Sequence, residues 1–232
     1  VQQIHQTTLR ILAEVGILLD HPETREILLD FGAEVYNNRV ILPPDLVEGS
    51  LEKCGGPVTV FGRGTELQIG GGELHWHNLG GARDIFDPVT CTTRNANVED
   101  VCQATRLLDA LEYVSTVTPF FTPTDVPGAI MSLAMYRHAL PNTTKPLQGP
   151  GVQNAVAVKY AVEMAAAAGL DGVPSLSVSP ISPLTFPDEI AASILEIARK
   201  GIPFGPLPCP TAGTTAPLSL AGALAQQNAE VL

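Results

Sequence analysis

The first third of the chain alternates between helical periodicity and short extended segments. Apolar residues recur at helical spacing through residues 1–18 and again through residues 23–31, where Asp20 is a plausible N-cap and Gly32 a stop. Residues 35–42 form short extended pieces around Asn37 and Asn38, and a third helix is predicted over residues 44–53. This region is therefore predicted to be mainly helical.

Residues 58–85 show the two-residue alternation of β-strands. Runs at 59–61, 67–69 and 74–79 are separated by glycine-rich segments at 62–64 and 70–72. Short strands with glycine turns between them predict a small antiparallel β region. Helical periodicity resumes over residues 97–111, with Asn97 as the expected cap.

Beyond Leu111 the pattern becomes a repeat of one strand followed by one helix. The expected strands cover residues 113–118, 146–148, 175–178 and 202–207, and the expected helices cover residues 129–139, 152–168, 188–200 and 218–232. Such alternation predicts parallel βαβ units. The fold class is thus α/β, a (β/α)8 TIM barrel of which about the first four βα units are present, with residues 1–110 as an N-terminal helical and β region and residues 111–232 as the first half of the barrel.

Composition narrows the classes of function. The formal net charge is −11, and the 13 Lys and Arg residues are scattered along the chain, which argues against a nucleic-acid partner. Apolar runs stay shorter than a membrane span requires, so we expect a cytoplasmic protein. Four cysteines, at 54, 91, 102 and 209, lack metal-ligand spacing and predict neither a metal site nor a disulfide framework.

The segment from Pro208 to Pro217, PCPTAGTTAP, closely resembles the trimethylamine methyltransferase family of corrinoid-dependent methylamine and glycine-betaine methyltransferases. The likeness continues through Leu220-Ala221-Gly222 and QQNAE at 226–230, and it also covers the chain's opening, Gly80-Gly81 and Lys145-Pro146-Leu147. Family members are roughly twice as long as this chain, on the scale of an extended barrel. We therefore expect this chain to be an N-terminal half, with the catalytic residues beyond Leu232.

The resemblance implies methyl transfer from a methylated or quaternary amine to the cob(I)alamin of a separate corrinoid protein. The expected partners are that corrinoid protein, a small methylated amine and further copies of the chain in a homo-oligomer; no cofactor is expected to bind tightly to this chain itself. The rival interpretations are a truncated binding fragment without turnover and a TIM-barrel enzyme of another class, such as a lyase or aldolase. A lysine at a strand end would favour a lyase, but Lys145 lies at a strand start.

In a TIM barrel the site lies where strands end, so the loops after the strands supply the candidate residues. Phe120, Phe121 and Asp125 could bind a trimethylammonium group through aromatic faces and negative charge, or could serve packing and a helix N-cap. Gln148 could bind a carboxylate or a corrinoid amide, or could simply begin a tight turn. Gly213 and Thr214 lie in a nearly uncharged loop that suits close approach of a flat cofactor face.

Other candidates carry weaker arguments. His75 and His77 share one strand face and could bind zinc, but no third ligand is evident, so a structural role is favoured. Trp76 and Tyr113 could line a cation cage or serve packing, and hydroxyls at Ser177, Ser179 and Ser182 suit turn hydrogen bonds. Cys209 has no neighbouring base that would activate it as a nucleophile.

Overall fold

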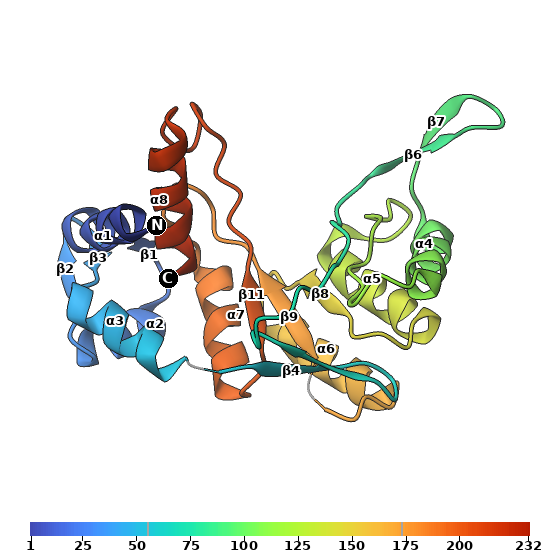
Figure 1. The fold of residues 1–232 in the computed structure, drawn as a ribbon, viewed down its shortest axis with the longest axis horizontal. Helices are drawn as coiled ribbons and strands as arrows, with labels where there is room; N and C mark the ends of the chain where they lie inside the picture. The colour runs from blue at the N-terminus through green and yellow to red at the C-terminus, as the bar shows by residue number, and fades with distance from the viewer. Residues whose placement is uncertain (55, 173) are drawn as a thin grey trace. The chain divides into compact units, whose positions relative to one another are not determined.

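The computed structural model describes residues 1–54, 56–172 and 174–232 as a mixed α/β structure. Two compact units are present (Figure 1). Unit 1 comprises Val1–Gly55, Val178–Glu196 and Pro206–Leu232, and unit 2 comprises Gly56–Ser177 and Ile197–Gly205. The expected division at residues 110 and 111 stays a prediction. No helix among the described residues is both long and apolar enough to cross a membrane.

Unit 1 is built largely from helices, as the periodicity predicted. They are α1 (Gln2–Arg10) with a π-helical continuation (Ile11–Val15), α2 (Pro22–Asp30), α3 (Pro44–Lys53), most of α7 (Asp188–Arg199) and α8 (Leu220–Val231). The expected cap of α2 was wrong: His21, not Asp20, is the N-cap, and its Nδ1 accepts a hydrogen bond from the Thr24 amide at 3.2 Å. Asn37 and Asn38 adopt positive φ and join β2 (Glu34–Tyr36) to β3 (Arg39–Ile41), which confirms the expected turn.

The core of unit 1 joins the two ends of the chain. Its buried residues come from both the first 50 residues and the last 50: Leu9, Leu12, Ile17, Leu19, Ala33, Val40, Val47, Leu184, Ala191 and Ala229. The strand β1 (Leu18–Leu19) pairs in parallel with β10 (Thr185–Phe186). Helices α1 and α8 meet at the buried Thr8, whose hydroxyl donates to the Ala225 carbonyl and accepts from the Asn228 amide.

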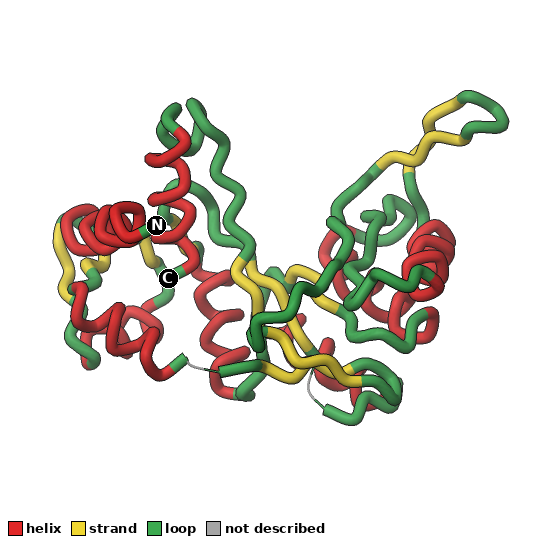
Figure 2. The backbone as a smooth tube through the Cα atoms, in the orientation of Figure 1, coloured by secondary structure: helices red, strands yellow, loops and turns green. Residues whose placement is uncertain are grey.

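Unit 2 contains two antiparallel hairpins. The pair β4 (Val58–Phe61) and β5 (Glu66–Ile69) confirms the first two predicted strands. The pair β6 (Asp84–Asp87) and β7 (Thr92–Asn95) was not predicted, and Figure 2 shows it as a two-stranded arm that extends from the helices of this unit. Residues at the arm's tip are exposed, so nothing in its hydrophobic pattern distinguished it from a loop.

The third predicted antiparallel strand, residues 74–79, was wrong. This segment instead runs parallel to residues 115–122, with bridges from His77 to Thr116 and from Ala82 to Phe121. Between these two bridges, the side chain of Asn78 makes hydrogen bonds that the backbone would make in a regular strand. Its side-chain NH2 group donates to the Thr118 carbonyl at 2.7 Å, and its side-chain oxygen accepts from the Thr118 amide at 3.0 Å. One strand and the helix after it, α4 (Val98–Ala110), thus precede the four predicted βα units.

The remaining strands follow in sequential order. Residue Val117 bridges to Leu147 in parallel, β8 (Gln148–Gly151) pairs in parallel with β9 (Ser175–Val178), and β9 lies between β8 and β11 (Phe204–Pro206). The helices after them are α5 (Met131–Ala139), α6 (Ala155–Ala167), α7 (Asp188–Arg199) and α8. Strands and helices therefore alternate as predicted, in an open arrangement: the described residues form no closed barrel.

The β4–β5 hairpin covers the amino ends of these strands. Its Val60 and Ile69 side chains line one small space together with Pro146 and Ser175, which begin the neighbouring strands. The ring of Phe61 lies so close to Gly172 that a Cβ there would come within 2.3 Å of it. The hairpin therefore covers this end of the strands, where Thr116 and Gln148 line the same space.

Candidate functional site

Polar side chains gather on one face of the parallel strands. Thr116, Ser175 and Ser177 are buried on this face, while Val117 and Leu176, which alternate with them, are fully buried on the other. The Thr116 hydroxyl donates to Oε1 of Gln148 at 3.4 Å. A side chain on Gly205 would lie 3.8 Å from Nε2 of Gln148. We call Thr116, Gln148, Ser175, Ser177 and Gly205 the polar face.

Gln148 is thus held at the polar face by the Thr116 hydroxyl. The next residue, Gly149, has a φ of +90°, and a Cβ there would lie 3.4 Å from the Ser177 hydroxyl. The positive φ supports the tight-turn interpretation for Gly149. The Gln148 side chain accepts from the Thr116 hydroxyl and keeps two N–H donors, and its binding role stays a prediction.

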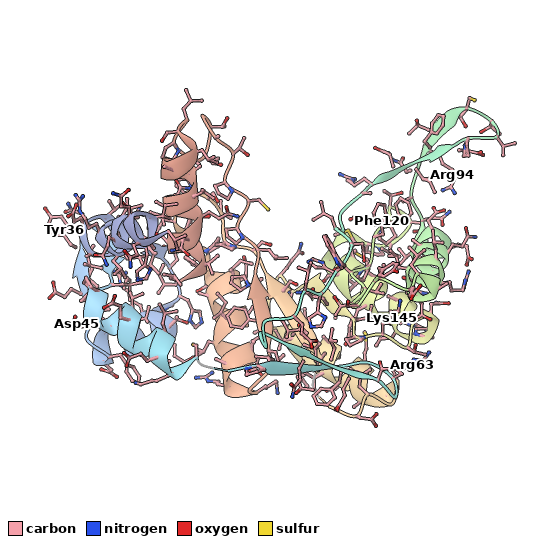
Figure 3. The ribbon with its side chains drawn as sticks, in the orientation of Figure 1. Tyr36, Asp45, Arg63, Arg94, Phe120 and Lys145 are labelled. Carbon is pink, nitrogen blue, oxygen red and sulfur yellow. The ribbon has the colours of Figure 1, made fainter. Side chains whose placement is uncertain are left out.

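The two candidate phenylalanines contact each other. Phe120 and Phe121 form an edge-to-face pair with ring centroids 4.9 Å apart and an interplanar angle of 80°. Both are half-buried in unit 2, where Figure 3 labels Phe120. An aromatic pair that retains exposed surface at a strand end can receive a cation, because ring faces attract positive charge.

Asp125 has a different structural role. Its carboxylate accepts from the backbone amide of Val98, with distances of 3.1 Å to Oδ1 and 3.4 Å to Oδ2. Val98 is the first residue of α4, so Asp125 satisfies a free amide and complements the positive end of the helix dipole. This supports the capping alternative, although for α4 and not for the helix that follows Asp125.

Gly213 and Thr214 lie in unit 1, in the loop after β11. This loop is a compact turn in which the Thr211 carbonyl accepts from three amides, those of Thr214, Thr215 and Ala216. Gly213 has a φ of +80°, and its amide donates to the Ala216 carbonyl at 2.9 Å. The two candidates are exposed, which is compatible with a contact surface for a large partner.

The weaker candidates receive structural explanations. His75 lies 4.0 Å from Glu73, and His77 lies on the edge strand beside Thr116; among the described residues no group of three metal-binding side chains is found. Trp76 and Tyr113 are 60% and 78% exposed, which contradicts the packing interpretation. Cys102 is buried, whereas Cys54, Cys91 and Cys209 are exposed.

Lys145 serves α4. Its ammonium donates to the carbonyls of Leu108 at 3.2 Å and Leu111 at 2.6 Å, at the end of that helix. A lysine engaged in this way offers no amine for Schiff-base chemistry.

Asp109 lies near this contact. Burial would raise the pKa of Asp109, but hydrogen bonds from the Thr143 hydroxyl and from the amides of Thr144 and Lys145 outweigh the effect of burial. The pKa of Asp109 is therefore lowered.

Sequence reasoning missed several residues that shape the site. Thr116 falls inside a predicted strand, but only pairing shows that it faces Gln148. Asn78 is polar and sits in a glycine-rich segment, so nothing indicated that it completes a parallel strand. Glu230 belongs to the quoted QQNAE motif, yet a glutamate is rarely buried, and its exposure of 2% follows from partners far away in the sequence.

Taken together, these features define an α/β protein with parallel strands in sequential order, a polar face that lies partly beside the β4–β5 hairpin, and an aromatic pair at Phe120 and Phe121. Comparison with known proteins identifies the family. The family model described as trimethylamine methyltransferase (MTTB) matches residues 1–232, so the chain belongs to that family.

Individual relatives agree. The chain is 30% identical over 240 residues to trimethylamine methyltransferase MttB of Desulfitobacterium hafniense (strain DSM 10664 / DCB-2), covering 99% of this chain and 48% of the relative. It is 28% identical to the glycine betaine methyltransferase of D. hafniense (strain Y51), with 100% and 50% coverage, and 27% identical to MttB of Methanosarcina barkeri, with the same coverage. The chain spans about half the length of the curated relatives it matches.

Proposed function

We propose that the protein to which this chain belongs transfers a methyl group from a methylated or quaternary amine to the cob(I)alamin of a corrinoid protein. The observation that carries the proposal is the family match over the whole chain, with relatives named for trimethylamine and for glycine betaine. The fold proposed with it is a (β/α)8 barrel, supported by the sequential strands β8, β9 and β11, by two preceding segments that bridge in parallel, and by the helices that alternate with them.

In this reaction the protein does not need to supply a nucleophile. Cobalt(I) supplies the nucleophile and belongs to the partner protein, which makes the corrinoid a substrate. The chain's own residues must orient the methyl-bearing nitrogen and exclude water. The half-buried pair of Phe120 and Phe121 fits the first task, because a trimethylammonium group has no hydrogen to donate and is stabilised by ring faces.

Gln148 and its neighbours fit the rest of such a substrate. Glycine betaine carries a carboxylate as well as a quaternary nitrogen, and the side-chain N–H groups of Gln148, whose Oε1 accepts from the Thr116 hydroxyl, are proposed to donate to it. Trimethylamine has no carboxylate and would not use these donors. The exposed, uncharged loop around Gly213 and Thr214 is proposed to receive the corrinoid protein.

The test is a methylation assay of cob(I)alamin with the full-length protein. Trimethylamine, dimethylamine, glycine betaine, carnitine and proline betaine are supplied in turn while the corrinoid absorbance is followed. Turnover with one amine supports the proposal. Binding of an amine without turnover would favour a binding protein, and neither binding nor turnover by a folded protein would favour another barrel chemistry.

The aromatic contact is tested by Phe120→Ala, with Phe86→Ala on the exposed β6–β7 arm as the matched control. Loss of a cation–π contact in a partly desolvated site costs about 1–2 kcal/mol, which corresponds to roughly 5- to 30-fold weaker binding of the quaternary amine. The control should bind as the unmodified protein does. Equal affinities in both variants would remove Phe120 from the site.

A further inference from the structure

A buried carboxylate on α8 joins two loops of unit 1. Glu230 is 2% exposed; its Oε2 accepts from the Ser182 hydroxyl at 2.7 Å, and its Oε1 accepts from the Leu184 amide at 3.0 Å. Oε1 also accepts from the side-chain amide of Gln226 at 2.9 Å. That amide in turn donates to the Thr215 carbonyl at 2.8 Å. The network therefore runs from residues 182–184 through α8 to residue 215.

Both ends of this network lie in loops that follow parallel strands. Residues 179–184 come after β9, and residues 207–219 come after β11. Thr215 belongs to the compact turn that contains Gly213 and Thr214, since its hydroxyl accepts from the Thr211 amide and its own amide donates to the Thr211 carbonyl. The hydrogen bond that holds the Thr215 carbonyl in place therefore also holds the whole turn in place.

The loop at residues 179–184 also needs contacts from outside the loop to keep its conformation. Leu184 has a φ of +51°, in the left-handed region that a leucine side chain disfavours. Such a conformation persists only when its surroundings impose it, and here the Leu184 amide donates directly to the Glu230 carboxylate. A hydrogen bond to an ionised acceptor is stronger than one between neutral groups, so a carboxylate suits this position.

We propose that Glu230, acting through Gln226, is a positioning residue that sets the loops after β9 and β11 for methyl transfer. It contacts neither substrate nor corrinoid; it determines where the turn at Gly213 and Thr214 sits relative to the loop at Ser182 and Leu184. The inference rests on the proposed function for its catalytic consequence, but the coupling of the two loops can be measured without any activity.

The variants separate the two branches of the network. In Glu230→Ala both loops lose their anchor, whereas Glu230→Gln keeps an oxygen for Leu184 and Gln226 and can donate to the Ser182 hydroxyl. Gln226→Met removes the bridge from Glu230 to Thr215 but keeps the Glu230 contacts with Ser182 and Leu184, and Ser182→Ala removes only a link to the first loop. Gln227→Ala, exposed on the same helix, is the matched control.

Hydrogen exchange of the full-length protein gives the first readout. Glu230→Ala should raise amide exchange about tenfold or more in residues 182–185 and in residues 213–216, because both sets of amides then open more often. Gln226→Met should affect only the second set and Ser182→Ala only the first. Glu230→Gln and Gln227→Ala should match the unmodified protein. If Glu230→Ala leaves either set of amides unchanged in a folded protein, the proposal is overturned.

Methyl transfer to the corrinoid protein gives the second readout. Glu230→Ala should lower kcat/KM for the corrinoid protein about tenfold, with recovery in Glu230→Gln. An active enzyme in which the loops loosen but kcat/KM does not change would overturn the positioning role. If the unmodified protein transfers no methyl group from any amine, the proposed function fails, while the exchange data still decide whether Glu230 couples the loops. If Glu230→Ala does not fold, Gln226→Met and Ser182→Ala decide through their loop-specific exchange.

Discussion

The junction between the β6–β7 arm and α4 depends on one buried carboxylate, and its removal should be costly. Asp100 is 4% exposed, and both its oxygens accept from the Arg94 guanidinium at 2.7 Å. Oδ2 also accepts from the Asn97 amide at 2.9 Å, while the Asn97 side chain accepts from the Asp100 amide. Figure 3 shows Arg94 where the arm meets α4.

The magnitude of the loss in Asp100→Ala follows from these contacts. The capping interaction is worth about 1 kcal/mol. The bidentate ion pair would be worth several kcal/mol if both partners were buried, but half of the Arg94 side chain is exposed to water, which reduces its part to about 1–2 kcal/mol. Asp100→Ala should therefore lower the free energy of unfolding by about 2–3 kcal/mol.

Urea unfolding followed by circular dichroism measures this loss. Asp84→Ala is the matched control, because Asp84 is an exposed aspartate on the same arm with one hydrogen bond from the Asn95 side chain. The control should cost less than about 0.5 kcal/mol. A double-mutant cycle with Arg94→Met should return a coupling of about 1 kcal/mol or more. Equal losses in Asp100→Ala and Asp84→Ala would refute the reasoning.

The same pair predicts a dependence on pH. The Arg94 hydrogen bonds lower the pKa of Asp100 below the ordinary aspartate value, against the opposing effect of burial. A group whose pKa is depressed by folding contributes stability above its unfolded pKa and loses that contribution as pH falls through the folded pKa. The loss caused by Asp100→Ala should thus be full at pH 7 and shrink below about pH 4. A loss that is independent of pH down to pH 2 would contradict this assignment.

Two further substitutions should act in opposite directions. Tyr136 is fully buried, burial raises its pKa, and its hydroxyl has no hydrogen-bond partner in the described structure. Tyr136→Phe should therefore leave the free energy of unfolding unchanged or raise it by up to about 1 kcal/mol. A decrease of more than about 1 kcal/mol in urea unfolding would contradict the absence of a hydrogen-bond partner for the hydroxyl. Gly16 has a φ of +69°, and a Cβ there would lie 2.4 Å from the Val40 carbonyl oxygen; Gly16→Ala should cost about 2–4 kcal/mol, and a loss below 1 kcal/mol would show that the backbone relaxes freely.

The sequence by itself determined most of the local structure. The helices at residues 44–53, 97–111 and 188–200 follow from apolar periodicity and caps, and they form where predicted because local signals and packing agree. The turn at Asn37 and Asn38 is likewise local. The alternation of strands and helices after Leu111 also predicted parallel strands in sequential order. The family was recognised from a contiguous motif, which needs no tertiary information.

Tertiary structure alone decided which segments pair. Residues 74–79 alternate as an antiparallel strand would, but pairing direction is set by a partner 39 positions away, His77 with Thr116. The same applies to the site. Asp125 caps α4 because folding brings it to Val98, and Gln148 faces Thr116 because two strands align in register.

The last residues of the chain show the difference most clearly. The sequence gives no sign that Glu230 differs from other glutamates on an amphipathic helix. In the structure it is buried and accepts hydrogen bonds from Ser182, Leu184 and Gln226. Its role depends on contacts across 46 and 48 positions, and no local pattern encodes the position of a remote hydroxyl or amide. A sequence determines which side chains are available within a segment, whereas the meeting of segments determines what each of them contacts.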